Sequence, residues 1–166
     1  IAPIYHPMMA LEVLELVREK YSDVQMTMVG PQMPDLYQQM KARVHEKKLN
    51  VTFTGGLKKN EWRELSRNFD IFINTTHYDN MPVSVMEAMA LGLPIVSTNV
   101  GGLPYLIDHM HDGILVHDSD AKAMADAIDQ LIVEPRLAER LTQNALAKVA
   151  TMDNKVVVEQ WRKLLQ

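Results

Sequence analysis

Short apolar runs alternate along the chain with longer segments in which apolar residues recur every three or four positions. The short runs predict strands buried on both faces, and the longer segments predict amphipathic helices of about ten to fifteen residues. The expected strands cover residues 25–29, 51–53, 71–73, 94–96 and 113–116. The expected helices cover residues 7–21, 34–47, 60–67, 82–91 and 120–133, a segment that starts at Pro135, and 155–165.

This alternation predicts the α/β class, with a parallel sheet and helices on both of its faces. The C-terminal part departs from the alternation, because two or three helices follow the last expected strand. We therefore expect a helical C-terminus that wraps back over the domain or reaches towards a partner. The chain has 166 residues and no low-complexity linker, so residues 1–166 are expected to form one domain.

Composition and charge narrow the class of protein. Apolar residues make up 47% of the chain and charged residues 23%, which is ordinary for a soluble globular protein. The net charge of −4 gives no support to general electrostatic binding of nucleic acid or an anionic membrane. The chain has no cysteine, which excludes disulfides and thiolate metal sites and fits a reducing, cytoplasmic location. No apolar run approaches the roughly 20 residues that span a bilayer.

The first residues look like the interior of a longer protein. The chain begins at Ile1 without a methionine and enters a helix almost at once, as though an earlier strand had been removed. No signal-peptide pattern opens it. We expect an N-terminally truncated part of a longer protein.

The loops after the expected strands hold most of the glycine and are the candidate site. They cover residues 30–34, 54–59, 74–82 and 98–104, and in open sheets of this class ligands bind beyond the carboxyl ends of the strands. Residues 68–121 contain no Lys or Arg. If this region binds phosphate, the donors must be backbone N–H groups, a helix dipole, hydroxyls or histidine, or a cation must come from another segment.

Two carboxylates flank the start of the helix in the middle of the chain. Asp79 lies in the loop before this helix, and Glu87 lies more than one turn inside it. The free N–H groups of residues 83–85 favour an anion there, and carboxylates beside the anion can accept from sugar hydroxyls. The structural alternative is that Asp79 caps the helix and Glu87 is a surface residue.

Other motifs carry less information. The glycine pairs at 55–56 and 101–102 can let a backbone approach a ligand or can form plain tight turns. Neither GxGxxG nor GxxxxGK[ST] is present. The six histidines show no metal-ligand spacing, so no metal is expected. His77 lies in the candidate loop, where a surface histidine is favoured over a ligand contact.

The order of the weak motifs is more specific than any one of them. Asp79 is followed after seven residues by Glu87-Ala88-Met89-Ala90, then by Gly92-Leu93-Pro94 and the Gly101-Gly102 turn. This order and spacing resemble the donor-binding C-terminal domain of GT-B fold glycosyltransferases, in particular the large retaining family 4 (group 1). The resemblance covers nearly the whole chain and implies a Rossmann-like domain that is one half of a GT-B fold.

The resemblance also implies a role for each matched residue. Glu87 would accept hydrogen bonds from the ribose of a nucleotide sugar, and Asp79 would hold hydroxyls of the transferred sugar. The backbone that meets the sugar and the diphosphate would be that of Asn80, Met81, Pro82 and Val83. The residues beside the base, the phosphate or the base edge would be Gly55, Gly56, Leu57, Gly101 and Gly102. The nucleotide diphosphate sugar is a substrate, and neither a cofactor nor a metal is implied.

Two departures from the family pattern affect these expectations. Asp79 stands where Glu is commoner, and residues 1–9 lack the Arg/Lys pair that neutralises the diphosphate. We expect those cations to have been lost with the N-terminal segment. The acceptor-binding domain would also lie outside this chain, so the fragment alone is expected to be inactive. Any peripheral membrane association would come through that domain.

Three functions are therefore compared. The leading one is the donor-binding domain of a retaining hexosyltransferase in glycan or polysaccharide biosynthesis. The second is half of a nucleotide-sugar epimerase or phosphorylase, which needs a different arrangement of acidic groups. The third is a non-enzymatic α/β binding module, and a receiver of this kind would need paired acids at its first strand and a lysine at a late strand.

Overall fold

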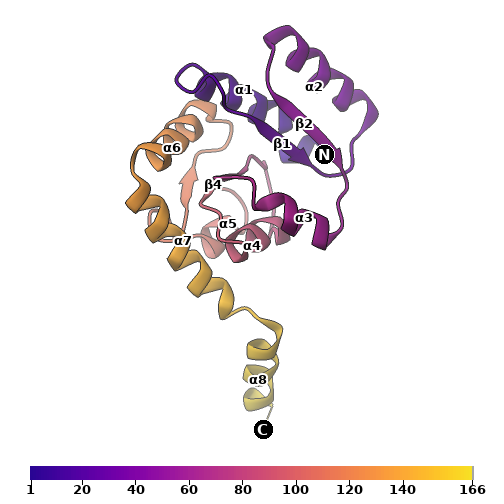
Figure 1. The fold of residues 1–166 in the computed structure, drawn as a ribbon. Coiled ribbons are helices and arrows are strands. Elements are labelled where there is room, and N and C mark those ends of the chain that lie inside the picture. Colours follow the sequence, from indigo (N-terminus) through magenta and orange to yellow (C-terminus); the bar gives the residue numbers. More distant parts are fainter. Residues whose placement is uncertain (166) are drawn as a thin grey trace.

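The computed structural model describes residues 1–165 and has the alternating α/β architecture that the sequence predicts (Figure 1). A short 3-10 turn, η1 (Pro3–Tyr5), leads into the first helix, and strands and helices then alternate. The strands are β1 (Met26–Val29), β2 (Val51–Gly55), β3 (Phe72–Asn74), β4 (Ile95–Thr98) and β5 (Ile114–Val116). The helices are α1 (Pro7–Arg18), α2 (Pro34–Lys47), α3 (Lys59–Ser66), α4 (Val83–Ala90), α5 (Leu103–Leu106), α6 (Ala121–Val133), α7 (Pro135–Ala150) and α8 (Asn154–Leu164).

All the strand pairings are parallel, as expected, but they form two sheets instead of one. β1 pairs with β2, while β4 lies between β3 and β5 in a three-stranded sheet. Within residues 1–165 no hydrogen-bonded ladder joins β1 to β3. In the larger sheet Asn74 is in register with Ser97, and Thr98 with Val116. The carboxyl ends of its three strands therefore lie along one edge, where their loops form the candidate site.

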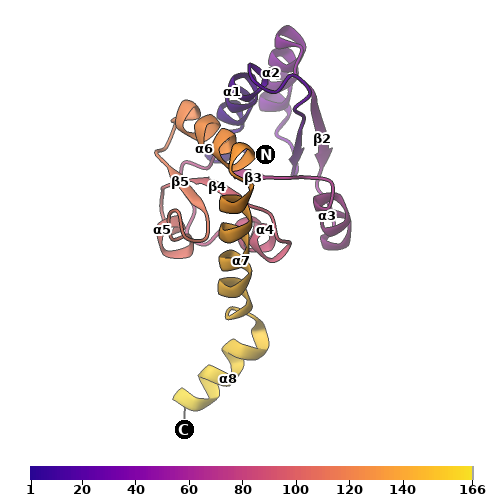
Figure 2. The same ribbon diagram turned by 60° about the vertical axis from the view of Figure 1, so that its left-hand side comes forward.

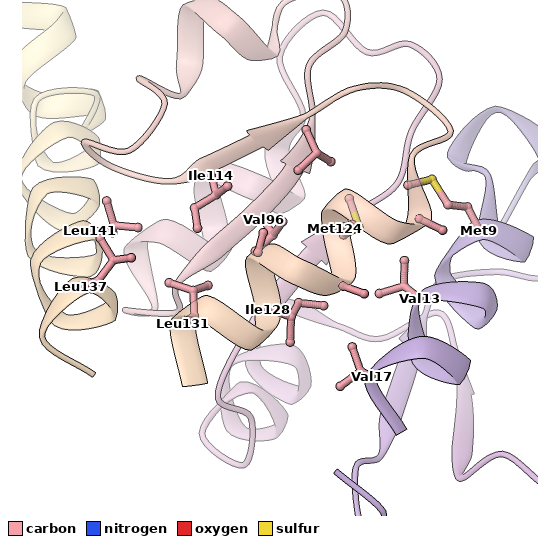
Figure 3. Packing of buried hydrophobic residues seen from close by; sticks show 14 residues of the cluster. Met9, Val13, Val17, Val96, Ile114, Met124, Ile128, Leu131, Leu137 and Leu141 are labelled. Atoms are coloured by element: carbon pink, nitrogen blue, oxygen red, sulfur yellow. The ribbon is translucent and has the colours of Figure 1, made fainter. Parts of the chain in front are cut away.

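Helix α1 packs against both parts of the divided sheet. Its residues Met9, Val13 and Val17 belong to the main core cluster, and Figure 3 shows them beside Met124 and Ile128 of α6. Another face of α1 packs towards α2 and the β1–β2 sheet, in a cluster whose buried members are Leu11, Leu14, Met40 and Leu49. The apolar positions of α1 thus serve two cores, and the helix holds the two sheets together.

A few element ends differ from the expected ones. α1 ends at Arg18, before the expected end at residue 21, and Tyr21 donates instead from Oη to Asp129 Oδ1 at 2.8 Å. Pro82 is the N-cap of α4 and not its first residue, because its ψ of 112° is extended. Gly92 follows α4 with a φ of +78°, the left-handed conformation expected of a glycine that ends a helix.

The helical C-terminus is confirmed, but its last helix does not wrap back over the domain. α7 packs against α4 and α6, whereas α8 extends away from the rest of the chain in both views (Figures 1 and 2). Trp161 and Leu164 of α8 are 59% and 76% exposed. No helix in the described part of the chain is both long enough and apolar enough to cross a membrane.

Candidate functional site

The loops that follow the strands meet through backbone hydrogen bonds. The ends of β1 and β2 are joined where Gly30 N donates to Gly55 O at 2.8 Å. The β3–α4 loop and the β4–α5 loop are joined where Gly102 N donates to Asp79 O, also at 2.8 Å. The expected loops are therefore in contact in pairs at the carboxyl ends of their strands, where ligands bind in folds of this class.

Helix α4 begins at this edge without a side-chain cap. Its N-cap is Pro82, and its first turn contains no acidic residue. The capping alternative for Asp79 is therefore wrong. Backbone hydrogen bonding begins with Val85 N, which donates to Pro82 O at 3.1 Å, so the N–H groups before it are the unpaired donors of a helix N-terminus. Such donors, together with the helix dipole, can bind an anion.

Glu87 lies on α4 and meets a lysine from another segment. Lys59 Nζ is 3.2 Å from Glu87 Oε1, and the two side chains are 87% and 32% exposed. An ion pair this exposed adds only about 0–1 kcal/mol to stability. Lys59 is the first residue of α3, directly after the loop that contains Gly55 and Gly56. A cation therefore reaches the stretch 68–121, which has none of its own.

The glycine pair 101–102 packs against the backbone of the β3–α4 loop. Gly101 has a φ of +54°, and a Cβ added there would overlap the carbonyl of Asp79. A Cβ added at Gly102 would overlap the carbonyl of Asn80. Contact between two loops of this chain is therefore sufficient to require both glycines. The place of this pair beside a phosphate or base stays a prediction.

The glycine pair 55–56 has different surroundings. Gly55 has a φ of +72°, and a Cβ built on it would have no heavy atom within 4 Å. At Gly56 the nearest atom would be Pro31 Cδ at 4.0 Å. The backbone before Leu57 is thus open enough for a flat ligand such as a base to approach it. Two hollows lie away from this loop, one between α1 and α6 and one beside α2 and β2.

Two histidines and an aspartate also meet at this edge. The rings of His6 and His77 stack with centroids 4.1 Å apart, and His77 Nδ1 is 2.9 Å from each carboxylate oxygen of Asp118. Burial lowers the pKa of His6, and the nearby His77 lowers it further. Partial burial acts to raise the pKa of Asp118, but hydrogen bonds from His77 and Ser119 outweigh it and hold that pKa below its ordinary value. His77 is exposed, as expected, but it is not isolated.

Sequence spacing could not reveal this group, because its members come from three separate segments. His6 precedes α1, His77 lies between β3 and α4, and Asp118 follows β5. The nearest signal in the sequence was that all three positions border strand ends or a helix start.

Comparison with known proteins identifies the family. A model of the family described as glycosyl transferases group 1 matches residues 3–148. The chain belongs to this family. The amylovoran biosynthesis glycosyltransferase AmsK of Erwinia amylovora is 29% identical over 153 residues, which cover 87% of this chain and 37% of AmsK. The N,N'-diacetylbacillosaminyl-diphospho-undecaprenol alpha-1,3-N-acetylgalactosaminyltransferase of Campylobacter jejuni is 31% identical over 101 residues, 61% of this chain and 27% of that protein.

Solved structures show the same fold. Anabaena HepE in complex with UDP-glucose matches with a TM-score of 0.87 and 20% identity, over 99% of this chain and 46% of that one. The C-terminal domain of the group 1 glycosyl transferase LpcC from Francisella tularensis matches with a TM-score of 0.81 and 23% identity, over 92% and 81%. The fold expected from the sequence, a Rossmann-like half of a GT-B protein, is confirmed. The chain spans less than half the length of the two curated relatives.

Proposed function

We propose that this group 1 chain is the donor-binding domain of a retaining glycosyltransferase. The enzyme would transfer a sugar from a nucleotide diphosphate sugar to an acceptor in glycan or polysaccharide biosynthesis, in the cytoplasm. One observation carries the proposal: Glu87, on the uncapped helix α4, pairs with Lys59, which directly follows the open backbone of the β2–α3 loop. The family match favours this function over the epimerase and binding-module alternatives.

A nucleotide diphosphate sugar has groups that suit each part of this arrangement. Its ribose and its sugar carry hydroxyls, which donate to carboxylates such as Glu87 and Asp79. Its diphosphate is an anion, which suits the free N–H groups of Val83 and Ser84 at the uncapped start of α4 and the positive end of the α4 dipole. Its base is flat and suits the open backbone at residues 55–57. The HepE structure, which contains UDP-glucose, supports a ligand of this class.

The positive groups of this chain can neutralise only part of the negative charge of the diphosphate. In sugar transfer the main electrostatic task is to stabilise the charge that develops on the leaving diphosphate. Residues 68–121 supply N–H donors but no Lys or Arg, and Lys59 is already paired with Glu87. In this proposal the remaining cations and the acceptor site belong to other parts of a longer protein. The chain alone would then bind the donor without transferring its sugar, and no metal is required for the transfer.

The test of donor binding is a titration of the untagged chain with UDP, GDP and ADP, followed by amide chemical shifts. We expect one nucleotide to shift the amides of residues 55–59, 80–84 and 87 while distant helices stay unchanged. If no nucleotide diphosphate moves these amides at millimolar concentration, the donor-site assignment is wrong for this chain.

The role of Glu87 can be separated from general damage to the site with Glu87→Gln. This variant keeps the size of the side chain and removes its charge, so nucleotide binding should weaken about tenfold, the value of one hydrogen bond to a charged group. A ribose contact predicts more: the wild type should prefer UDP to 2′-deoxy-UDP, and Glu87→Gln should lose this preference. Affinities can be measured by calorimetry.

The matched control is Glu139→Gln, because Glu139 is exposed on α7 and its carboxylate accepts a hydrogen bond from Gln143 of the same helix. Its affinity for UDP should equal that of the wild type. A Glu87→Gln variant that still discriminates against 2′-deoxy-UDP would refute the ribose contact, even if donor binding itself is confirmed.

A further inference from the structure

His6, His77 and Asp118 bring three metal-ligating side chains to one point. One ligand atom of each side chain lies within 4.8 Å of the other two. The three residues come from the start of α1, the β3–α4 loop and the segment after β5. Neither the family match nor the donor-site proposal assigns a role to this group.

The backbone around the group is held by hydrogen bonds between distant segments. His77 N donates to Ile4 O at 2.8 Å, and Thr75 Oγ1 donates to Tyr5 O at 2.7 Å. These bonds fix the segment before His6 against the end of β3. The two imidazoles are stacked as a result, and the position of each depends on tertiary structure instead of on its own loop.

The conformation of His6 is costly for the chain. Its φ of 44° is in the left-handed region, where a residue other than glycine costs about 1–2 kcal/mol. Strain of this kind persists only where the surroundings impose it, and it clusters at functional sites. Here it directs an imidazole towards His77 and Asp118.

One nitrogen of His6 also lacks a partner. His6 Nδ1 is buried and makes no hydrogen bond to any described residue. A buried polar atom without a partner costs roughly 1–3 kcal/mol. On the other side of the stack, His77 Nδ1 faces both oxygens of Asp118 at 2.9 Å. A metal ion held between the three side chains would be bound by one nitrogen of each imidazole and would share the charge of Asp118.

We propose that His6, His77 and Asp118 bind a divalent transition-metal ion of the zinc class. Two imidazole nitrogens and one carboxylate oxygen form a donor set that suits Zn²⁺ and similar ions, whereas Mg²⁺ and Ca²⁺ prefer oxygen ligands alone. Three protein ligands leave a fourth tetrahedral position for water or for an oxygen of a bound molecule. This proposal does not depend on donor binding.

The ion would stabilise the fold as well as occupy the edge of the site. The three ligands join α1, the loop after β3 and the segment after β5, which are distant in sequence. A ligand that binds only the folded state raises its stability by mass action. The metal-bound chain should therefore melt at a higher temperature than the metal-free chain.

The test uses Co²⁺ as a probe on the untagged, chelator-treated chain. Visible absorption should rise to saturation at one Co²⁺ per chain with the intensity of a four-coordinate site, and Zn²⁺ should displace it. His77→Ala and Asp118→Asn should each weaken Co²⁺ binding by at least about tenfold. Both variants should keep the wild-type circular dichroism and lose the metal-induced rise in melting temperature.

The control is His111→Ala, since His111 is exposed and lies outside the group. It should bind Co²⁺ as the wild type does. The proposal is overturned if the wild type shows no saturable Co²⁺ or Zn²⁺ binding. It is also overturned if His77→Ala and Asp118→Asn bind with unchanged affinity, because the two histidines would then form only a stack with an ion pair.

Discussion

At the scale of single residues, the position of Asp79 and Asn80 depends on two glycines from a different loop. The carbonyls of Asp79 and Asn80 occupy the space that side chains at Gly101 and Gly102 would need. Asp79 O also accepts the hydrogen bond from Gly102 N. The β4–α5 turn therefore fixes the backbone of the loop that carries Asp79, the proposed sugar contact.

Gly102→Ala should therefore disturb the site and the fold together. The added methyl group overlaps a backbone carbonyl, which cannot rotate away as a side chain could, so the cost should be at least about 2 kcal/mol. Urea unfolding measures this loss, and the amide shifts of Asp79 and Asn80 report the displaced loop. Gly56→Ala is the control, because its Cβ meets only Pro31 Cδ at 4.0 Å. Equal stability of the two variants would show that the loop contact is unimportant.

The sequence predicted the local structure around these residues, but it did not predict the contact between the two loops. Residues 79–102 carry local signals of a loop, a helix and a turn, and all three are confirmed. The contact between Gly102 and Asn80 joins two loops, and no local pattern encodes it. The same reason hid the group formed by His6, His77 and Asp118, whose members are brought together only by the fold.

At the scale of elements, the segment that directly follows α1 is linked to α6 by polar contacts beside the core that the two helices share. Lys20 Nζ donates to Asp129 Oδ2 at 2.7 Å, and Tyr21 Oη donates to Asp129 Oδ1 at 2.8 Å. The hydrogen bond from Lys20, and then that from Tyr21, hold the pKa of Asp129 below its ordinary value. This carboxylate therefore favours the folded state in its charged form.

The contribution of Asp129 should depend on pH in a defined direction. Because the folded pKa is depressed, the stabilisation is complete above the unfolded pKa of about 4 and is lost as the pH falls through the folded pKa. Asp129→Asn should melt below the wild type near neutral pH, and the difference should shrink below about pH 4. Asp126→Asn is the control, since Asp126 pairs with Lys122 of its own helix. A difference for Asp129→Asn that is constant with pH would contradict this account.

Elements were predicted well from periodicity, but their neighbours in the sheet were not. The apolar side chains of a three-residue strand such as Phe72–Asn74 indicate that it is a strand facing a core. They do not indicate which strands lie next to it in the sheet. The division between the β1–β2 pair and the larger sheet was therefore missed. The early end of α1 was missed as well. Tyr21 continues the apolar spacing of the helix in the sequence, but it lies outside α1 and donates a hydrogen bond to Asp129.

At the scale of the whole molecule, α8 lies apart from the packed domain (Figure 2). Among its described side chains, Val157 alone is partly buried, and the others are exposed. Removal of residues 154–166 should therefore leave the urea midpoint and the m-value unchanged. Trp62 remains in the shortened chain as a fluorescent probe, because its ring packs edge-on against Phe72 with centroids 6.1 Å apart. A lower midpoint would mean that α8 stabilises the domain.

The position of α1 has a consequence for how the domain opens. No ladder joins the two sheets within residues 1–165, so each could separate and fluctuate independently with its own covering helices. One face of α1 is buried with α6, and another with α2 and the β1–β2 pair, so either sheet can come away only by exposing apolar surface on α1. Separation of either sheet therefore carries a free-energy cost from the apolar surface of α1 that it exposes to water. The amides in the middle of α1 should then exchange with solvent only when the whole domain unfolds, and the divided sheet behaves as one cooperative unit.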